Sequence, residues 1–392
     1  MNTTSLLRNL ALWVATVLAL SGCGGGQEPG ATADPLSLPT TESSPQAISA
    51  TTAKQGILAI STSPRLEPFP TSSAEYDALK SEADALAYGA GARGQIATFT
   101  WRELEPRSGS YDEAKLAQLQ AQIDAAKAKA MVQYVGIQVI NTYVKELPED
   151  LAGLAFDDVQ VITRFRALLK RIVGANIKRI RYLSIGNEVD VYLASHAAEL
   201  APYKAFYRDA ARTAHALDPA IQVGVTGSGA GALGSEAAML SELNAAGSDV
   251  VMLTYYPMQS SPDGNASVRD PSAVAGDITR LLSLAGRKPL VLQEVGYPVS
   301  SLNGSSEASQ AEFMRQIFKA WSGSNGRIPF VNFFLLHDFP DQLCSDLLAY
   351  YGLPNGVTLK ASLCSLGLRT VDGTARQAWA TLVDEMKKAR LP

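Results

Sequence analysis

Two glutamates stand at the ends of apolar, strand-like segments. Glu188 follows the segment 180–186, and Glu294 lies near the end of the segment 289–295. Two facing carboxyl groups can cleave a glycosidic bond, because one protonates the leaving oxygen while the other attacks the anomeric carbon or activates water. Taken singly, each has a plain alternative: Glu188 can cap a helix, and Glu294 can be an exposed loop carboxylate. The pair is informative only if the fold brings both strand ends together.

Eight short β-prone segments alternate with segments of helical periodicity. Apolar residues recur at helix spacing, for example at Leu116, Leu119 and Ile123. Strands that are apolar on both faces and alternate with helices predict a parallel sheet whose faces are covered. Eight such units in roughly 340 residues predict the α/β class and a (β/α)₈ TIM barrel, as a single catalytic domain over 53–392. The segments are 56–62, 95–101, 130–138, 180–186, 221–227, 249–256, 289–295 and 330–336.

A doubly wound open sheet is the alternative fold. It usually carries a GxGxxG turn after an early strand, which this chain lacks there; we expect the glycine-rich stretch 227–234 to be a flexible loop. In a barrel, the carboxyl ends of all strands form one rim, where catalytic groups sit. Glu188 ends the fourth strand and Glu294 the seventh, so a barrel places them across its mouth.

Several motifs resemble the clan A retaining glycoside hydrolases, a (β/α)₈ superfamily. They are Asn187-Glu188 after strand 4, Glu294 at strand 7, Tyr255-Tyr256-Pro257 after strand 6, "WRELEPRSGSYD" (101–112) after strand 2 and "GLRTVDGTARQAW" (367–379) before the last helix. The resemblance implies that Glu188 is the acid/base and Glu294 the nucleophile. By motif, endo-β-1,4-galactanases and endo-β-1,3-glucanases are the most similar families.

The chemistry sets the expected charge states of the pair. Burial and a charged neighbour raise a carboxyl pKa, so we expect Glu188 to be protonated at rest and Glu294 to stay ionised through hydrogen bonds. Either Tyr255 or Tyr256 is expected to donate to Glu294. Adjacent strand residues face opposite sides, so only one of them can point into the site. Asn187 is expected to reach the sugar 2-hydroxyl.

Two further aromatic positions are candidates for substrate binding. Trp101 is either a stacking platform for a sugar ring or a core residue. His337, after strand 8, either contacts substrate or has a structural partner. The clan usually has a tryptophan at this strand end, and this chain departs from that pattern: Phe333, Phe334 and His337 are the candidates to take its place. The three histidines show no ligand spacing, so we expect no metal and no cofactor.

The first residues resemble a bacterial lipoprotein signal. An apolar segment too short to span a bilayer comfortably precedes Leu20-Ser21-Gly22-Cys23. The resemblance implies a signal peptide over 1–22 and acylation of Cys23, with the lipid bilayer as partner and the bacterial cell envelope as location; an ordinary secretory peptide is the alternative. Segment 23–52 has few large apolar residues and is expected to be a flexible linker.

The remaining cysteines predict a disulfide, and the net charge limits the class of partner. Cys344 and Cys364 are expected to form a disulfide in an oxidising compartment, with two unpaired thiols as the alternative. The segment 339–366 that contains them is expected to overhang the barrel mouth. The net charge is −4 and no dense basic run occurs, which argues against a nucleic-acid partner.

Together these features predict an exported retaining glycoside hydrolase that cleaves a β-linked polysaccharide or oligosaccharide by double displacement. Two alternatives use the same barrel. A transglycosylase would pass the sugar to an acceptor in place of water, and a non-catalytic barrel would use the carboxylates only to bind sugar hydroxyls.

Overall fold

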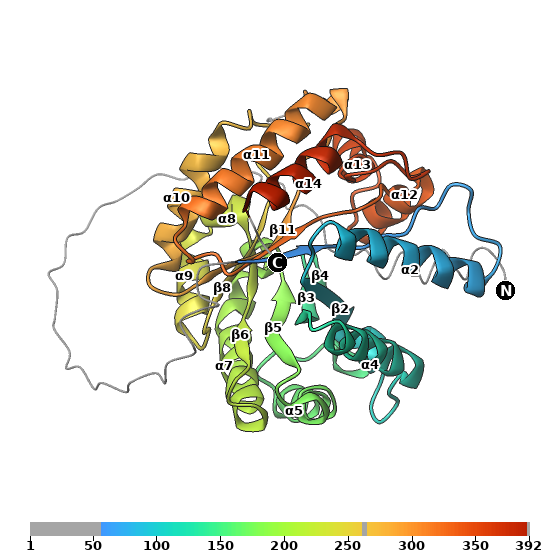
Figure 1. Cartoon of the computed structure of the whole chain (residues 1–392). Helices are drawn as coiled ribbons and strands as arrows, with labels where there is room; N and C mark the ends of the chain where they lie inside the picture. Colours follow the sequence, from blue (N-terminus) through green and yellow to red (C-terminus); the bar gives the residue numbers. More distant parts are fainter. Residues whose placement is uncertain (1–55, 261–264, 390–392) are drawn as a thin grey trace, which may run out of the picture.

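The computed structural model describes residues 56–260 and 265–389. Within these residues the chain forms a barrel of parallel strands (Figure 1). The barrel strands are β1 (Ile57–Ile60), β2 (Gly94–Thr100), β3 (Val132–Asn141), β5 (Ile180–Asn187), β6 (Gln222–Gly224), β7 (Thr226–Ser228), β8 (Val251–Tyr255), β11 (Leu290–Val295) and β12 (Phe330–Phe333). Each lies within or overlaps one of the eight predicted segments.

The fifth strand closes the ring. β6 and β7 are separated only by Val225, so they are two stretches of one barrel strand. β6 pairs with β5, while β7 pairs with β8. Counting them as one strand gives eight, and the (β/α)₈ prediction is confirmed. β1 and β2 pair at a single register position, Ala59 with Gly94.

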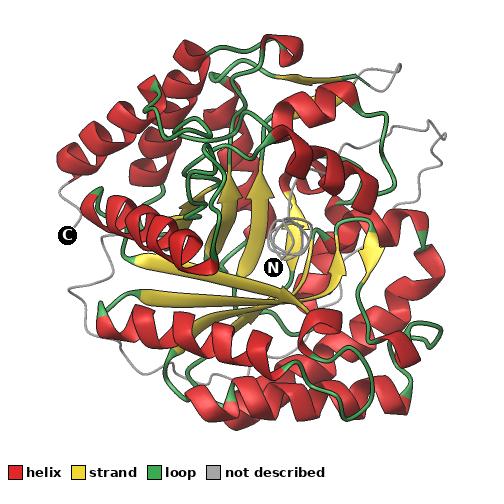
Figure 2. Ribbon diagram, turned by 90° about the vertical axis from the view of Figure 1, so that its right-hand side faces the viewer, coloured by secondary structure: helices red, strands yellow, loops and turns green. Residues whose placement is uncertain are grey.

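Helices surround the barrel (Figures 1 and 2). Figure 1 shows α4, α5 and α7 on one side and α10, α11 and α14 on the other. The outer helices are α2 (Ser73–Gly89), α4 (Glu113–Ala128), α5 (Val159–Ile172), α7 (Leu200–Leu217), α9 (Ala237–Ala245), α10 (Ala273–Ala285), α11 (Glu307–Gly323) and α14 (Gln377–Ala389).

Shorter elements occupy the connections. They are α3 (Trp101–Leu104), α6 (Val189–Ser195), α8 (Gly229–Leu233), α12 (Asp341–Tyr350), α13 (Val357–Leu363), β4 (Val144–Lys145), the hairpin β9 (Met258–Ser260) with β10 (Ala266–Val268), and 3₁₀ turns at Glu149–Leu151, Gly174–Asn176, Ala197–Glu199 and Ser301–Asn303. The stretch 227–234 is not the flexible loop that we expected. It contains the end of β7 and helix α8, whose first turn is capped by the Ser228 hydroxyl.

Side chains fill the barrel interior in alternation along each strand. Tyr134, Tyr182, Met252 and Phe330 are buried together inside the barrel. The residues between them point outward and pack against the helices, as strand geometry requires. Toward the carboxyl end the interior becomes polar, and the Thr226 hydroxyl hydrogen-bonds the Tyr134 hydroxyl at 3.0 Å. This packed interior is the floor on which the site is built.

The predictions for the N-terminal segment lie outside the described residues. These are the signal peptide over 1–22, acylation of Cys23 and the linker over 23–52. In the part of the chain that the structure covers, no helix has the length and apolarity to cross a membrane. The predicted disulfide between Cys344 and Cys364 is formed.

Candidate active site

The end of β5 turns sharply to place Glu188. Gly186 has a φ of 95°, and a Cβ there would lie 2.5 Å from Cγ1 of Val189, so this position requires glycine. Glu188 itself has a φ of 44°, in the left-handed region that non-glycine residues seldom adopt. The turn directs the Glu188 side chain over the barrel interior, where the residue is 1% exposed.

Two threonine hydroxyls from neighbouring strand ends hold the Glu188 carboxyl group. Thr254 on β8 donates to Oε1 at 2.6 Å, and Thr142, after β3, donates to Oε2 at 3.0 Å. The pKa of Glu188 is raised to about 7, chiefly by burial and in part by the charge of Asp190, against the two hydroxyl donors that lower it. A carboxyl group with this pKa carries a proton at neutral pH much of the time, as a general acid requires.

A β-bulge points Glu294 into the barrel. Along β11, Val291 faces the interior and Leu292 faces the helices. Simple alternation would then turn Glu294 outward, but the pairing register with β8 shifts between Leu292 and Glu294. The extra residue, Gln293, lets Glu294 face inward while Val295 returns to the outer core. Bulges commonly re-aim a side chain beside a functional site.

Glu294 is buried and accepts two hydrogen bonds. The Tyr256 hydroxyl donates to Oε2 at 2.7 Å, and Nε2 of Gln293 donates to Oε1 at 3.0 Å. Burial raises the pKa of Glu294 well above its ordinary value, and the charge of Glu188 adds to the rise, against the two donors. The hydrogen bonds to Glu294 agree with the expectation, whereas the raised pKa differs from the expectation that Glu294 stays ionised. Coupled carboxyl groups share their protons, so the pair holds at least one proton at neutral pH.

The two glutamates meet at one end of the barrel. The Cα atoms of Glu294 and Thr254 are register partners across β11 and β8, and the Thr254 hydroxyl bonds Glu188. One threonine therefore bridges the strand that carries Glu294 to the carboxyl group of Glu188. The structure thus brings together the two residues that the sequence singled out.

Asn187 and Tyr256 are the two predicted binding residues that lie next to the glutamates. Asn187 is buried, and its Nδ2 donates to Oδ1 of Asn141 at 3.4 Å. Its Oδ1 has no hydrogen-bond partner among the described residues, so this oxygen can accept a hydroxyl group from a ligand. Tyr256 is the tyrosine that contacts Glu294.

The prediction that Tyr255 belongs to the site is wrong. It lies one residue before Tyr256 on the opposite face of β8, where its hydroxyl donates to Oδ2 of Asp277 on α10 at 2.9 Å. Its ring stacks on Phe313 of α11, with centroids 6.2 Å apart. Strand alternation decides the outcome, since Thr254 and Tyr256 both face the interior.

The prediction that Trp101 binds sugar is also wrong. Its side chain is fully buried, and its ring meets Phe165 edge-on with centroids 4.9 Å apart. Its indole Nε1 donates to Oε2 of Glu105 at 2.9 Å. A capping box formed by Thr100 and Glu103 starts helix α3 at Trp101, and this turn directs the ring into the outer core.

His337 has a structural partner, the second of its two predicted alternatives, and the structure gives no support to its predicted role in substrate binding. Its Nδ1 and the backbone carbonyl of Ser63 are 2.7 Å apart, and its backbone N–H donates to the Ser63 hydroxyl. Of the candidates for the strand 8 position, Phe334 lines a cavity with Glu294, whereas Phe333 stacks on Phe318 in the outer core.

A cavity of about 140 Å³ reaches the nucleophile candidate. Glu294, Gln293 and Asn332 line one part of it, and the lining continues past β1 to Lys80 and Asp84 on α2. Space for a ligand atom therefore adjoins the Glu294 carboxyl group.

Sequence reasoning missed four polar residues of the site. Asp190 is buried and accepts hydrogen bonds from the backbone N–H and hydroxyl of Ser228, and burial raises its pKa to about 6. Thr142, Thr254 and Gln293 donate directly to the glutamates. Gln293 and Asp190 lie within two residues of the glutamates in the sequence, and this proximity could have marked them as site candidates. Across residues 56–260 and 265–389, no cluster of His, Cys, Asp and Glu has the geometry to hold a metal ion.

Comparisons with known proteins agree with the barrel. No protein-family model and no curated protein matches the sequence. A GH5_18 protein from Streptomyces cattleya, solved with Manb1-4GlcNAc, superposes with a TM-score of 0.67 at 16% identity over 86% of this chain and 81% of its own. An exo-beta-1,4-mannosidase from Opitutaceae bacterium strain TAV5 gives 0.62 at 16%, over 85% and 59%. Xylanase 10B from Thermotoga maritima gives 0.56 at 13%, over 86% and 97%. At these identities the likeness shows a shared fold.

Proposed function

We propose that the protein is a retaining β-glycoside hydrolase. The single observation that carries the proposal is the buried carboxyl pair, Glu188 and Glu294, at the carboxyl ends of the fourth and seventh barrel strands. Burial keeps at least one proton on the pair at neutral pH, which is the state that double displacement requires.

Asp190 favours one assignment of the two roles. Its charge adds to the rise in the pKa of Glu188 and so favours a protonated Glu188, while the two hydrogen bonds to Glu294 favour an ionised Glu294 against the burial that raises its pKa. The motif resemblance makes the same assignment, with the acid/base after strand 4 and the nucleophile at strand 7. The hydroxyl of Tyr256 and the amide of Gln293 then orient the Glu294 carboxylate as the nucleophile. This gives Glu188 the role of acid/base.

The reaction follows in two steps. Glu294 attacks the anomeric carbon and forms a glycosyl ester, while the bond to the leaving oxygen breaks and that oxygen takes the proton of Glu188. Glu188, now a carboxylate, removes a proton from water, and the water oxygen displaces Glu294 from the anomeric carbon. Both displacements invert the centre, so the product keeps the configuration of the substrate. The free Oδ1 of Asn187 is placed to accept the sugar 2-hydroxyl.

β-Mannosides are the first substrates to test. Two of the structural neighbours support this choice, since one was solved with Manb1-4GlcNAc and another is named as a mannosidase. The motif resemblance adds β-galactans and β-glucans to the panel, and the xylanase neighbour adds xylans. Oligosaccharides of these four classes, with their aryl glycosides, form the panel.

Covalent trapping tests the proposal. The protein is incubated with 2-deoxy-2-fluoro glycosides from the panel, which slow the second step, and the labelled peptide is identified by mass spectrometry. We expect the label on Glu294, with hydrolysis lost in Glu294→Gln and Glu188→Gln. Glu312→Gln is the control, because this exposed carboxylate on α11 bonds only Arg315 and Gln316 in the described chain. Absence of label and of product across the panel would refute a hydrolase. Products longer than the substrate would indicate a transglycosylase.

We also propose that the protein is exported and anchored to a membrane through an acylated Cys23. The lipoprotein-like motif Leu20-Ser21-Gly22-Cys23 supports this proposal. A multiply acylated residue would hold the barrel at the envelope surface, since more than one acyl chain is needed for stable anchoring.

A further inference from the structure

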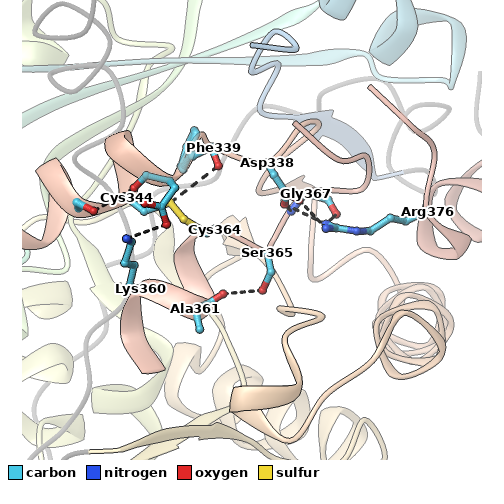
Figure 3. The surroundings of a disulfide bond; sticks show 11 residues. Asp338, Phe339, Cys344, Lys360, Ala361, Cys364, Ser365, Gly367 and Arg376 are labelled. Carbon is cyan, nitrogen blue, oxygen red and sulfur yellow. Dashed lines mark hydrogen bonds and ion pairs between the residues drawn. A yellow bond between two sulfur atoms is a disulfide. The ribbon is translucent and has the colours of Figure 1, made fainter. Parts of the chain in front are cut away.

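A helical insertion between β12 and α14 lies over the site. We call residues 341–364, which contain α12 and α13, the cap. The disulfide between Cys344 and Cys364 joins the first turns of α12 to the end of α13 (Figure 3). The ion pair between Lys360 and Asp341, 2.7 Å long, links the same two helices. The cap is therefore one cross-linked unit.

The apolar side of the cap packs on the mouth of the barrel. Leu343, Leu347, Leu359 and Leu363 are buried in a cluster that also contains the site residue Tyr256. The same cluster includes residues of the segments after strands 1, 6 and 8: Leu66, Met258, Ala266, Phe334 and Phe339. The inner face of the cap is thus continuous with the wall that holds Glu294.

The far end of the cap is fastened on the other side of the mouth. Tyr350, the last residue of α12, donates its hydroxyl to Oε1 of Glu146, and the same hydroxyl accepts from Nδ2 of Asn141 at 3.2 Å. Asn141 in turn accepts from Asn187, which precedes the acid/base candidate Glu188. One chain of hydrogen bonds thus runs from the cap to the site.

Aromatic contacts strengthen this attachment. The ring of Tyr351 lies edge-on to the ring of Tyr143, with centroids 5.6 Å apart, and 5.1 Å from that of Tyr350. Tyr143 belongs to the connection that follows β3. The cap therefore spans from strand 8, where it is attached in sequence, to the end of strand 3.

The covering leaves the reacting groups almost without exposure. Glu188 is 1% exposed, and Glu294 and Asn187 are each 2% exposed. A polysaccharide that runs through an open cleft needs room on both sides of the bond that is cleaved, and a site covered from strand 8 to strand 3 does not provide it.

We infer that the cap makes the site a blind pocket that accepts only a chain end, with Tyr350 as the specificity-determining residue that holds it shut. This inference rests on the proposed function. In double displacement the leaving portion must depart and water must enter while the first sugar stays on Glu294. The open side of the pocket therefore faces the leaving group, and the terminal non-reducing sugar occupies the blind side. The enzyme removes sugars one at a time from non-reducing ends of β-linked oligosaccharides.

Substrates with blocked ends test the inference. β-Linked oligosaccharides of the hydrolysed class are prepared with a free or a 4,6-acetal-blocked non-reducing terminus, and products are followed by mass spectrometry. Steric exclusion should slow the wild type on blocked chains by about 100-fold or more. Tyr350→Phe loses a charge-assisted and a neutral hydrogen bond, so cleavage of blocked chains should rise about 10- to 100-fold. Tyr88→Phe, on the exterior of α2, should match the wild type.

A second measurement does not depend on activity. Glu294 is modified with a water-soluble carbodiimide and an amine, and the extent is read by peptide mass mapping against the exposed Glu312 as internal reference. In the wild type, Glu294 should react far more slowly than Glu312. In Tyr350→Phe, and in Cys344→Ser with Cys364→Ser, its labelling should rise about tenfold or more as the cap loosens.

The outcomes distinguish failure of the blind pocket from failure of the proposed hydrolase function. Equal cleavage of free and blocked chains, or internal fragments as first products, overturns the blind pocket and leaves the hydrolase standing. If no glycoside is hydrolysed while the labelling of Glu294 responds to Tyr350→Phe, the proposed function fails and closure by the cap stands. Unchanged labelling in both cap variants overturns the closure itself.

Discussion

The two adjacent tyrosines at the end of β8 allow a sharp test of the site. Tyr256→Phe removes one hydroxyl, the donor to Glu294 at 2.7 Å, and keeps the ring that packs under the cap. Tyr255→Phe makes the same chemical change one residue away, where the hydroxyl bonds Asp277 outside the barrel. The pair of variants separates an effect on the reaction from an effect on packing.

The expected magnitude follows from the nature of the hydrogen bond. A hydrogen bond to an ionised group contributes about 1.5–3 kcal/mol. If Tyr256 orients and stabilises the nucleophile, its loss should lower kcat/KM by about 10- to 150-fold, at roughly 1.4 kcal/mol per tenfold. The hydroxyl favours the ionised form of Glu294, so its removal raises the pKa of Glu294. The acidic limb of the pH profile, which reports loss of the ionised nucleophile, should therefore move to higher pH.

The assay is kcat/KM against pH on an aryl β-glycoside that the wild type hydrolyses, together with denaturant unfolding. Tyr255→Phe should keep the profile of the wild type and lose about 1.5–3 kcal/mol of unfolding free energy, because a buried acceptor loses its donor. An unchanged acidic limb in Tyr256→Phe would contradict the reasoning. So would an equal displacement of that limb in both variants.

Three other perturbations have defined outcomes. Asp190→Asn removes a charge that raises the pKa of Glu188, so the alkaline limb of kcat/KM should move to lower pH, as a pH-rate series will show. Arg376→Met leaves Asp338 buried without its ion-pair partner and should cost about 3–5 kcal/mol of unfolding free energy, measured by denaturant titration. Cys23→Ala should move the protein from the membrane pellet to the soluble fraction of cells that express it.

The Arg376 variant has a matched control, and the other two have an outcome that would contradict them. Lys388→Met breaks an ion pair with Glu385 in which the lysine is 68% exposed, and it should cost less than about 1 kcal/mol. If Lys388→Met and Arg376→Met lost similar amounts of unfolding free energy, burial of the ion pair between Arg376 and Asp338 would not explain its contribution to stability. An alkaline limb that stays in place in Asp190→Asn would remove Asp190 from the acid/base argument. Membrane retention of Cys23→Ala would exclude the acyl anchor.

The barrel was predictable because its signal is distributed over the whole chain. Eight apolar runs separated by helical periodicity leave few alternatives, and strand ends then place Glu188 and Glu294 on one rim. Helix α5 illustrates the strength of this signal, since its buried residues Phe165 and Leu168 lie on the stripe that the sequence shows.

The orientation of single side chains was harder to predict from the sequence. Which of Tyr255 and Tyr256 faces inward depends on how β8 registers against its neighbours, and no local pattern encodes that. Thr142 and Thr254 reach Glu188 from strands that are distant in sequence, so their roles had no sequence signal. Trp101 differs, because Thr100 and Glu103 form a readable capping box that starts a helix at this residue.

The direction in which the Glu294 side chain points depends on the bulge in β11. Side-chain direction along a strand repeats every two residues, so adding or removing one residue reverses everything beyond that point. If Gln293 were paired as an ordinary strand residue, the carboxylate of Glu294 would point into the helical layer. A chain shortened by Gln293 alone would lose the bulge and keep Glu294 facing the interior, but it would also lose the amide that donates to Oε1. The inward direction of Glu294 therefore depends on Gln293 staying unpaired in the ladder with β8, and any redesign of this strand that keeps Gln293 has to keep the bulge as well.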